Sequence, residues 1–232
     1  MLTQNAEDST LLNTSKSGSI LEWKEIRERL QSPIALPAPV KLHLIRHAQS
    51  KINADKRVTG SQDVELTPAG EEQAASLCEK LLPRYDIAFT STLKRSQKTL
   101  ELAMESGSIE VGEIFRDSRL NERCLGVLEG QEWRWIPEYA YGDLAYAPQD
   151  GESYEAVAKR VLSFLIELAD CTLEYSIKNI LISGHMGPMR IMVGILKDKE
   201  DPATVLNFTF SNTEVVELTW SRLAIPGFLR DF

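Results

Sequence analysis

The amino-acid sequence predicts an α/β protein with three layers, in which helices cover both faces of a mostly parallel central sheet. From residue 40 to residue 220, short apolar segments of strand character alternate with longer segments of helical spacing. Such alternation is typical of a parallel sheet, because the helix that links two parallel strands packs back onto the sheet. The chain has 232 residues, of which 43% are hydrophobic, and can therefore bury a core without disulfides or metals.

The first 39 residues are predicted to form an N-terminal extension, and residues 40–232 to form the domain itself. Residues 19–30 have the apolar spacing of an amphipathic helix, with Ser19 as its N-cap and Glu22 completing a capping box. Residues 32–39 include three prolines and predict a linker. The sequence leaves open whether this helix packs on its own domain, binds a partner or forms a dimer contact.

Within the domain, the expected strands and helices follow one another in regular order. Thr67 is the predicted N-cap of a helix whose first turn contains Pro68 and Glu71. Strands are predicted at residues 40–45, 86–90, 109–115, 179–183, 206–210 and 215–220, and helices at residues 67–82, 93–104, 153–170 and 188–196.

Bulk properties exclude several classes of function. A net charge of −8 argues against nucleic-acid binding, which needs a basic surface. No apolar run approaches the length of a membrane span, and the N-terminus lacks the apolar segment of a secretory signal. The three cysteines are widely spaced and do not form a zinc-binding pattern. We therefore expect a cytoplasmic protein with reduced thiols and with neither nucleic acid nor membrane as a partner.

Polar groups suited to an anion follow three of the predicted strands. Arg46 and His47 follow the first, Arg95 comes shortly after the second, and His185 follows the strand at 179–183. In open α/β sheets, ligands bind beyond the carboxyl ends of the strands, so neighbouring parallel strands would bring these groups together. Two arginines and two histidines favour a dianion pocket over a metal site. A neutral histidine there is a candidate nucleophile.

A candidate acid lies in the glycine-punctuated loop at residues 120–130, which follows a predicted strand and contains Glu122 and Glu129. Breaking a phosphate ester leaves an alkoxide that needs a proton, and a carboxyl group held over the site could donate it. An aromatic stretch with Trp133, Trp135, Tyr139, Tyr141 and Tyr146 follows this loop. These aromatic residues either pack over the core or form a lid that contacts the leaving group.

Six segments carry a family resemblance. The motif R-H-G-E-[ST]-x-x-N appears as residues 46–53, with Ala48 and Gln49 in place of the usual glycine and glutamate. The motif G-x-x-D-x-x-L-T-x-x-G-x-x-Q-A is found at 60–74 and L-x-E-x-x-x-G-x-x-E-G at 120–130, whereas S-x-L-x-R-A-x-x-T appears at 91–99 with Ser96 in place of the alanine. A G-E-S at 151–153 and a second histidine motif at 184–187 complete the set. Over about residues 40–220 the chain resembles the histidine phosphatase superfamily, also called the phosphoglycerate mutase-like family.

The resemblance implies a phosphoglycerate mutase-like fold and a role for each matching residue. His47 would attack phosphorus and carry the phosphoryl group. Glu122 would protonate the leaving oxygen and then activate water. The remaining matching residues would hold the substrate: Arg46, Arg95 and His185 on the phosphoryl oxygens, Asn53 as a further hydrogen-bond donor, and Thr59 and Gly60 in the substrate-contacting loop. No metal and no cofactor is implied.

Three functions remain open under this resemblance: a phosphatase, a phosphoglycerate mutase and an inactive phospho-ligand binding module. Family mutases commonly have a longer stretch between the acid and the second histidine than Glu122–His185, which favours a phosphatase of the metal-independent, phosphohistidine type. None of the charge-bearing positions is lost, which favours an enzyme. We expect a small phosphorylated metabolite as substrate, and the sequence leaves a homodimer possible.

Five further residues receive a structural interpretation from the sequence. His43 lies within the first predicted strand and is expected in the core or behind the site. Glu129 is expected to pair or cap within its loop, and Arg190 to form a structural ion pair. Lys51 and Arg57 are interpreted as solvated loop charges, with contact to a second anionic group of the substrate as the alternative.

Overall fold

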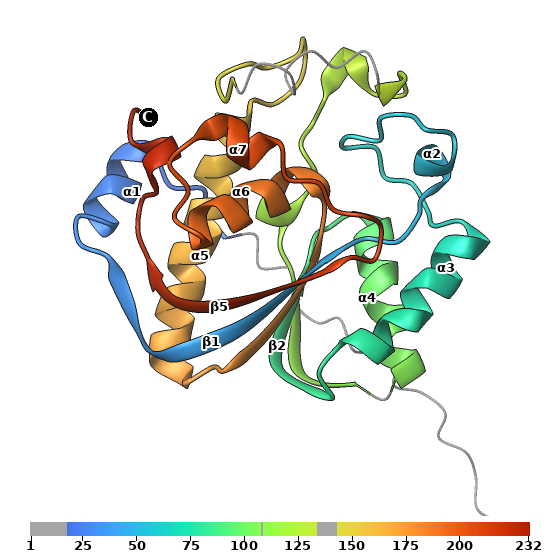
Figure 1. Cartoon of the computed structure of the whole chain (residues 1–232), viewed down its shortest axis with the longest axis horizontal. Coiled ribbons are helices and arrows are strands. Elements are labelled where there is room, and N and C mark those ends of the chain that lie inside the picture. Colours follow the sequence, from blue (N-terminus) through green and yellow to red (C-terminus); the bar gives the residue numbers. More distant parts are fainter. Residues whose placement is uncertain (1–17, 108, 134–142) are drawn as a thin grey trace, which may run out of the picture.

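A five-stranded sheet forms the centre of the computed structural model, which describes residues 18–107, 109–133 and 143–232 (Figure 1). Its strands are β1 (Ile34–Arg46), β2 (Arg84–Thr90), β3 (Glu110–Arg116), β4 (Asn179–Gly184) and β5 (Val215–Leu223). Their order across the sheet is β3-β2-β4-β1-β5. The first four strands are parallel, and β5 runs antiparallel to β1. The predicted mostly parallel sheet is confirmed.

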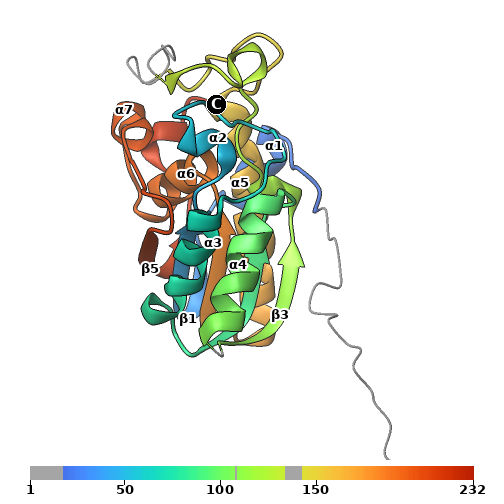
Figure 2. The same cartoon turned by 90° about the vertical axis from the view of Figure 1, so that its right-hand side faces the viewer.

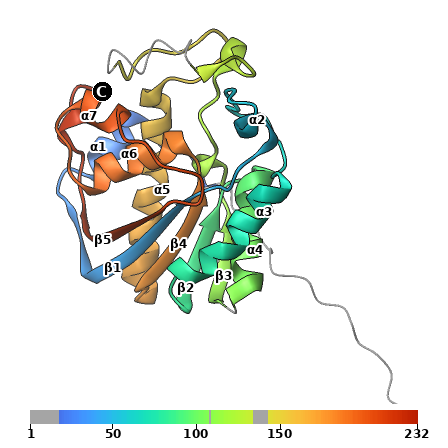
Figure 3. The same ribbon diagram turned by 45° about the vertical axis from the view of Figure 1, so that its right-hand side comes forward.

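Helices cover both faces of the sheet. They are α1 (Trp23–Arg29), α2 (Lys51–Ala54), α3 (Pro68–Ala75), α4 (Lys94–Gly107), α5 (Tyr154–Tyr175), α6 (Met186–Leu196) and α7 (Pro202–Leu206). Figure 2 shows α3 and α4 side by side on one face, with β3 at the edge of the sheet. Helices α5 and α6 lie on the other face, with α1 packed on α5 (Figure 3). Short 3₁₀ turns occupy Ser76–Lys80, Ser118–Leu120, Gly126–Leu128 and Gly227–Leu229.

Strand β4 shows why the central strands are apolar throughout. Ile180 and Ile182 belong to the larger core cluster, beside α5 and α6, whereas Leu181 belongs to the cluster beside α4. Successive side chains of a strand point to opposite faces, and here each face is covered by helices. All three side chains are at most 2% exposed, and each such burial stabilises the fold by about 1.5–3 kcal/mol.

The N-terminal extension packs on its own domain. The indole of Trp23 in α1 donates a hydrogen bond to Glu155 of α5 at 3.0 Å, and Arg29 pairs with Asp170 at 2.7 Å. The predicted helix exists but begins at Trp23, and its N-cap is Glu22, with Glu25 completing the capping box. Ser19 is therefore not the cap.

The predicted linker at residues 32–39 is wrong, because β1 begins at Ile34. Ile34 and Ala35 pair with β5, the register shifts between Ala35 and Val40, and pairing with β4 begins only at Lys41. The prolines at 37 and 39 therefore lie where the ladder is interrupted, and a proline's missing N–H costs little there.

Two other segments differ from the prediction. No strand forms at 206–210, because Asp201 caps α7 by accepting from the N–H of Thr204 at 2.8 Å, and Leu206 ends that helix. Thr67 caps α3 as predicted, but the helix tightens into a 3₁₀ turn from Ser76. In the described part of the chain, no helix is long and apolar enough to cross a membrane.

Candidate active site

A small cavity of about 20 Å³ lies beyond the carboxyl ends of β1 and β2. Seven of the eight predicted site residues line it: Arg46, His47, Asn53, Thr59, Gly60, Arg95 and Glu122. The eighth, His185, does not line the cavity, but its ring centroid lies 5.0 Å from that of His47. The groups meet because β4 lies between β1 and β2 and all three strands are parallel.

His47 is positioned as a nucleophile. It follows the last residue of β1, is 2% exposed, and its Nδ1 lies 2.7 Å from the carbonyl oxygen of Ala48. A carbonyl only accepts, so Nδ1 carries the proton and Nε2 keeps its lone pair. Burial, followed by the charges of Arg95 and Arg46, lowers the pKa of His47 well below 6.5. The imidazole is therefore neutral and nucleophilic at neutral pH.

Arg95 brings a buried positive charge to Nε2 of His47. Its side chain is fully buried, and its Nε lies 3.3 Å from that nitrogen. The two terminal nitrogens donate to the carbonyl oxygens of Gln62 at 2.6 Å and Gly60 at 2.9 Å. Burial lowers the pKa of Arg95 to about 10, so a charged guanidinium stays beside the nucleophile. Arg46 joins it from the end of β1, with its own guanidinium held by the carbonyl of Phe210.

His185 follows β4 and adds a second imidazole to the group of Arg46, His47 and Arg95. Its Nε2 lies 2.7 Å from Oγ of Ser91, which follows β2. Its Nδ1 is buried and has no hydrogen-bond partner among the described residues. A buried polar nitrogen without a partner is costly, and an anion oxygen would relieve that cost if the nitrogen donates to it. Burial and the nearby Arg95 lower the pKa of His185 well below 6.5.

Glu122 is held at the N-terminus of α6. Its Oε1 accepts hydrogen bonds from the backbone N–H of Arg123 and of Gly187, both at 2.9 Å. A Cβ atom at Gly187 would lie 2.5 Å from this oxygen, so glycine at that position allows the carboxylate to approach the helix. The other carboxylate oxygen is left for the reaction, which suits a general acid and base.

The loop that carries Thr59 and Gly60 is fixed by Glu129. One carboxylate oxygen of Glu129 accepts from the N–H of Ser61 at 2.7 Å and from that of Leu125 at 3.0 Å. Gly60 has a φ of +53°, and a Cβ there would lie 2.1 Å from the same oxygen. Glu129 therefore pairs within the loop region, as predicted, and also orders the carbonyl groups that hold Arg95.

The rest of the cavity wall is largely apolar. Apart from Trp133, which belongs to the aromatic stretch, it was not predicted as part of the site. It consists of Leu125, Trp133, Tyr154 and Met186, together with Arg123 and Gly187. Of the predicted aromatic stretch, Trp133 lines the cavity and Tyr146 does not, whereas Trp135, Tyr139 and Tyr141 lie outside the described residues. Trp133 is thus the described member that supports the lid interpretation.

Cations around the cavity have protein partners. Lys51 pairs with Glu65 at 2.9 Å, and Arg57 donates to the carbonyl oxygen of Gly130 at 2.7 Å. The guanidinium of Arg123 donates to the carbonyl oxygens of Glu152 and Tyr146 and lies 4.2 Å from the ring centre of Tyr154.

His43 and Arg190 are structural. His43 is 4% exposed, and its Nδ1 lies 2.6 Å from the hydroxyl of Tyr85, in the core as predicted. Arg190 donates to the carbonyl of Phe208 and to the hydroxyl of Tyr154. Among the residues that the structure describes, no three His, Cys, Asp or Glu side chains gather as a metal site would require.

Fold and site together define an α/β protein whose cavity brings two arginines, two histidines and a glutamate together at the ends of parallel strands. The sequence profile of the histidine phosphatase superfamily (branch 1) matches residues 42–224. The chain therefore belongs to the histidine phosphatase superfamily, whose relatives here are phosphoglycerate mutases and phosphatases.

Two relatives illustrate this division. A 2,3-bisphosphoglycerate-dependent phosphoglycerate mutase of Cytophaga hutchinsonii is 34% identical over 162 residues, which is 66% of this chain and 75% of the mutase. A broad-specificity phosphatase of Saccharomyces cerevisiae is 31% identical over 163 residues, which is 68% of this chain and 70% of the phosphatase. Sequence similarity alone therefore does not distinguish the two reactions.

Solved structures agree on the fold. A mycobacterial glucosyl-3-phosphoglycerate phosphatase superposes with a TM-score of 0.66 at 24% identity, over 82% of this chain and 99% of that one. TTHB049 from Thermus thermophilus superposes with a TM-score of 0.58 at 29% identity, over 80% of this chain and 100% of that one. The expected phosphoglycerate mutase-like architecture is confirmed.

Substitution of Gly187 by alanine tests the position of Glu122. The added Cβ would displace the carboxylate, whereas a Cβ at Gly184 would meet nothing within 4 Å. We expect Gly187→Ala to lower kcat/KM for an alkyl phosphate by about 10²-fold or more, since protonation of that leaving group is slow without an acid. The same variant should change kcat/KM for p-nitrophenyl phosphate far less, and Gly184→Ala should change neither. Equal losses on both esters would contradict this role of Glu122.

Stability should fall as the pH drops below about 6.5, the pKa of histidine in an unfolded chain. Burial lowers the pKa of all three histidines, His43, His47 and His185. Below 6.5 the unfolded chain binds protons that the folded protein does not bind, so each histidine lowers the free energy of unfolding by up to about 1.4 kcal/mol per pH unit.

Urea unfolding at several pH values measures this dependence. The His43→Gln variant removes a histidine that lies away from the cavity. Its stability should fall less steeply with decreasing pH than that of the wild type. Identical slopes for the two proteins would contradict the lowered pKa of His43.

Proposed function

We propose that the protein is a metal-independent phosphomonoester hydrolase that acts through a phosphohistidine intermediate on a small phosphorylated metabolite. In the first step, Nε2 of His47 forms a bond to phosphorus, the ester P–O bond breaks, and Glu122 gives a proton to the leaving oxygen. In the second step, a water attacks phosphorus, Glu122 takes its proton, and the P–N bond breaks to free His47.

Charge in the site supports this chemistry. Arg46, Arg95 and His185 lie around His47 and would provide positive charge and N–H donors to a phosphoryl group, and preorganised electrostatic stabilisation of this kind accounts for most of the catalysis of phosphoryl transfer. The amide nitrogen of Asn53 lies 3.1 Å from Oγ1 of Thr59 at the cavity wall and adds a neutral donor. These side chains supply the charge that a metal ion supplies in other phosphatases.

The protein partners of Lys51, Arg57 and Arg123 favour hydrolysis over the mutase reaction. A phosphoglycerate mutase must hold a substrate with a second anionic group and keep it through both transfers. Arg123 of the cavity wall is engaged by backbone carbonyls, and Lys51 and Arg57, which do not line the cavity, are engaged by Glu65 and by the carbonyl of Gly130. The remaining wall of Leu125, Trp133 and Met186 is apolar. This wall suits a leaving group with little charge, released after the first transfer.

The mutase remains the second candidate, because the relative from Cytophaga hutchinsonii carries that name at 34% identity. We also propose a cytoplasmic location. The three cysteines form no disulfide, and reduced thiols are the norm in that compartment.

A phosphate-release screen over phosphorylated metabolites, ranked by kcat/KM, tests the proposed function. We expect phosphate release from p-nitrophenyl phosphate and from monophosphates with uncharged leaving groups, with lower kcat/KM for esters that carry a second anionic group.

Two controls accompany the screen. Conversion of 3-phosphoglycerate to 2-phosphoglycerate without phosphate release, in the presence of 2,3-bisphosphoglycerate, would contradict the hydrolase and favour the mutase. Activity should survive EDTA, and its loss on chelation would show that a metal takes part.

A further inference from the structure

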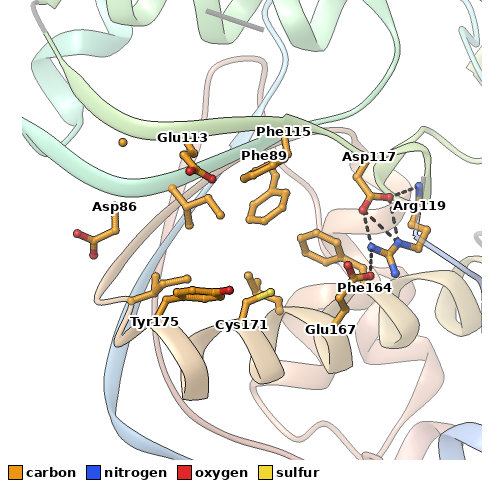
Figure 4. A pocket seen from close by; sticks show the side chains of 14 residues that line it. Asp86, Phe89, Glu113, Phe115, Asp117, Arg119, Phe164, Glu167, Cys171 and Tyr175 are labelled. Atoms are coloured by element: carbon orange, nitrogen blue, oxygen red, sulfur yellow. Dashed lines mark hydrogen bonds and ion pairs between the residues drawn. The ribbon is translucent and has the colours of Figure 1, made fainter. Parts of the chain in front are cut away.

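A cavity much larger than the one around His47 lies away from the candidate active site, between α5 and the edge of the sheet (Figure 4). It has a volume of about 580 Å³ and shares no lining residue with the cavity around His47. We call it the α5–β3 groove. Its lining residues are Asp86, Ile87, Phe89, Gly112, Glu113, Phe115, Asp117, Arg119, Phe164, Glu167, Leu168, Cys171, Tyr175 and Ile177.

The groove presents an aromatic surface beside an open strand edge. Figure 4 shows Phe89 and Phe115 facing Phe164 of α5, and the ring centroid of Phe89 lies 5.7 Å from that of Phe115 and 5.0 Å from that of Phe164. Strand β3 is the edge strand of the sheet, and its residues Gly112, Glu113 and Phe115 line the groove. Apolar hollows of this size on a protein surface are commonly covered by a partner segment.

The described chain begins at one end of this groove. Gly18 lies against Arg119, where a Cβ atom would be 2.2 Å from the guanidinium carbon. Arg119 is paired with Asp117 at 2.6 Å and with Glu167 at 2.8 Å, and all three line the groove. Arg119 and Glu167 also line a second hollow together with Gly18 and its neighbours. The described chain therefore begins beside the groove.

The length of the preceding segment matches the groove. Leu11 and Leu12 are the nearest large apolar residues before Gly18, and six extended residues span up to about 20 Å. Along α5 the groove extends from Phe164 to Tyr175, a distance of about 17 Å at the helical rise per residue. The two leucines can thus reach any part of the aromatic surface.

Charge also favours this occupant. Asp117 and Glu167 are paired with Arg119, and Asp86 and Glu113 add two further acidic side chains to the groove. Residues 9–17 carry no acidic side chain and include Lys16. A second copy of the chain would bring the same acidic side chains against these, and like charges at close range are destabilising. A segment of the same chain also binds at high effective concentration because it is already attached.

We propose that residues 9–17 dock in the α5–β3 groove of their own chain, with Leu11 and Leu12 against Phe89, Phe115 and Phe164. This inference is independent of the proposed function, because the groove and the cavity around His47 have no residue in common. It extends the anchoring of residues 19–29 along α5 to the preceding segment.

Cysteine labelling of the full-length protein tests the proposal, because Cys171 lines the groove and Cys124 does not. We expect maleimide to label Cys171 several-fold faster in a Leu11→Asp/Leu12→Asp double variant than in the wild type. The rate at Cys124 should not change. Equal rates at Cys171 would overturn the proposal. Protection of Cys171 that rises with protein concentration and persists in the double variant would also overturn it, in favour of a second copy.

A crosslink provides a second measurement that does not depend on a loss of binding. Under mild oxidation, a Leu12→Cys variant should form a disulfide with Cys171 within one chain, identified by peptide mapping. A Leu2→Cys variant is the matched control and should form far less of the crosslink to Cys171. Equal crosslinking in both variants, or crosslinks between chains only, would contradict docking of this segment.

Discussion

The buried charge of Arg95 is the constraint on which the candidate site depends. A guanidinium without solvent contact is costly unless its donors are satisfied and its charge is balanced. The carbonyl oxygens of Gly60 and Gln62 satisfy the donors, and Glu129 fixes the loop that presents them. The carboxylates of Glu122, Asp63 and Glu129 interact favourably with the charge of Arg95, whereas the charge of Arg46 opposes it. In the proposed reaction, the phosphoryl dianion would add further negative charge beside Arg95 and Arg46.

Several parts of the site could be predicted from the sequence because they follow strand ends. Arg46, His47 and His185 lie at the ends of β1 and β4, and parallel pairing brings them together. The role of Gly187 and the contact of Glu129 with Ser61 could not be predicted in this way. Both involve residues more than 60 positions apart, Gly187 with Glu122 and Glu129 with Ser61. Spacing along the chain carries no signal for such contacts.

The same distinction applies to the fold. Thr67, Pro68 and Ser153 are local signals, and the helices that they begin were predicted. The first half of β1 was mistaken for a linker, because its prolines dominate the local pattern while its partner strand β5 lies near the other end of the chain. At 206–210 the apolar alternation suggested a strand, but the Asp201 cap and Pro202 begin a helix that includes Leu206.

Detection of a phosphoryl group on His47 during turnover tests the central claim most directly. The protein would be mixed with p-nitrophenyl phosphate, quenched in alkali to preserve phosphohistidine, digested and analysed by mass spectrometry. The account predicts one added phosphoryl group on the peptide that contains His47, and none in a His47→Ala variant that retains the fold by circular dichroism. Steady turnover without a phosphorylated peptide, or with the group on His185, would contradict it.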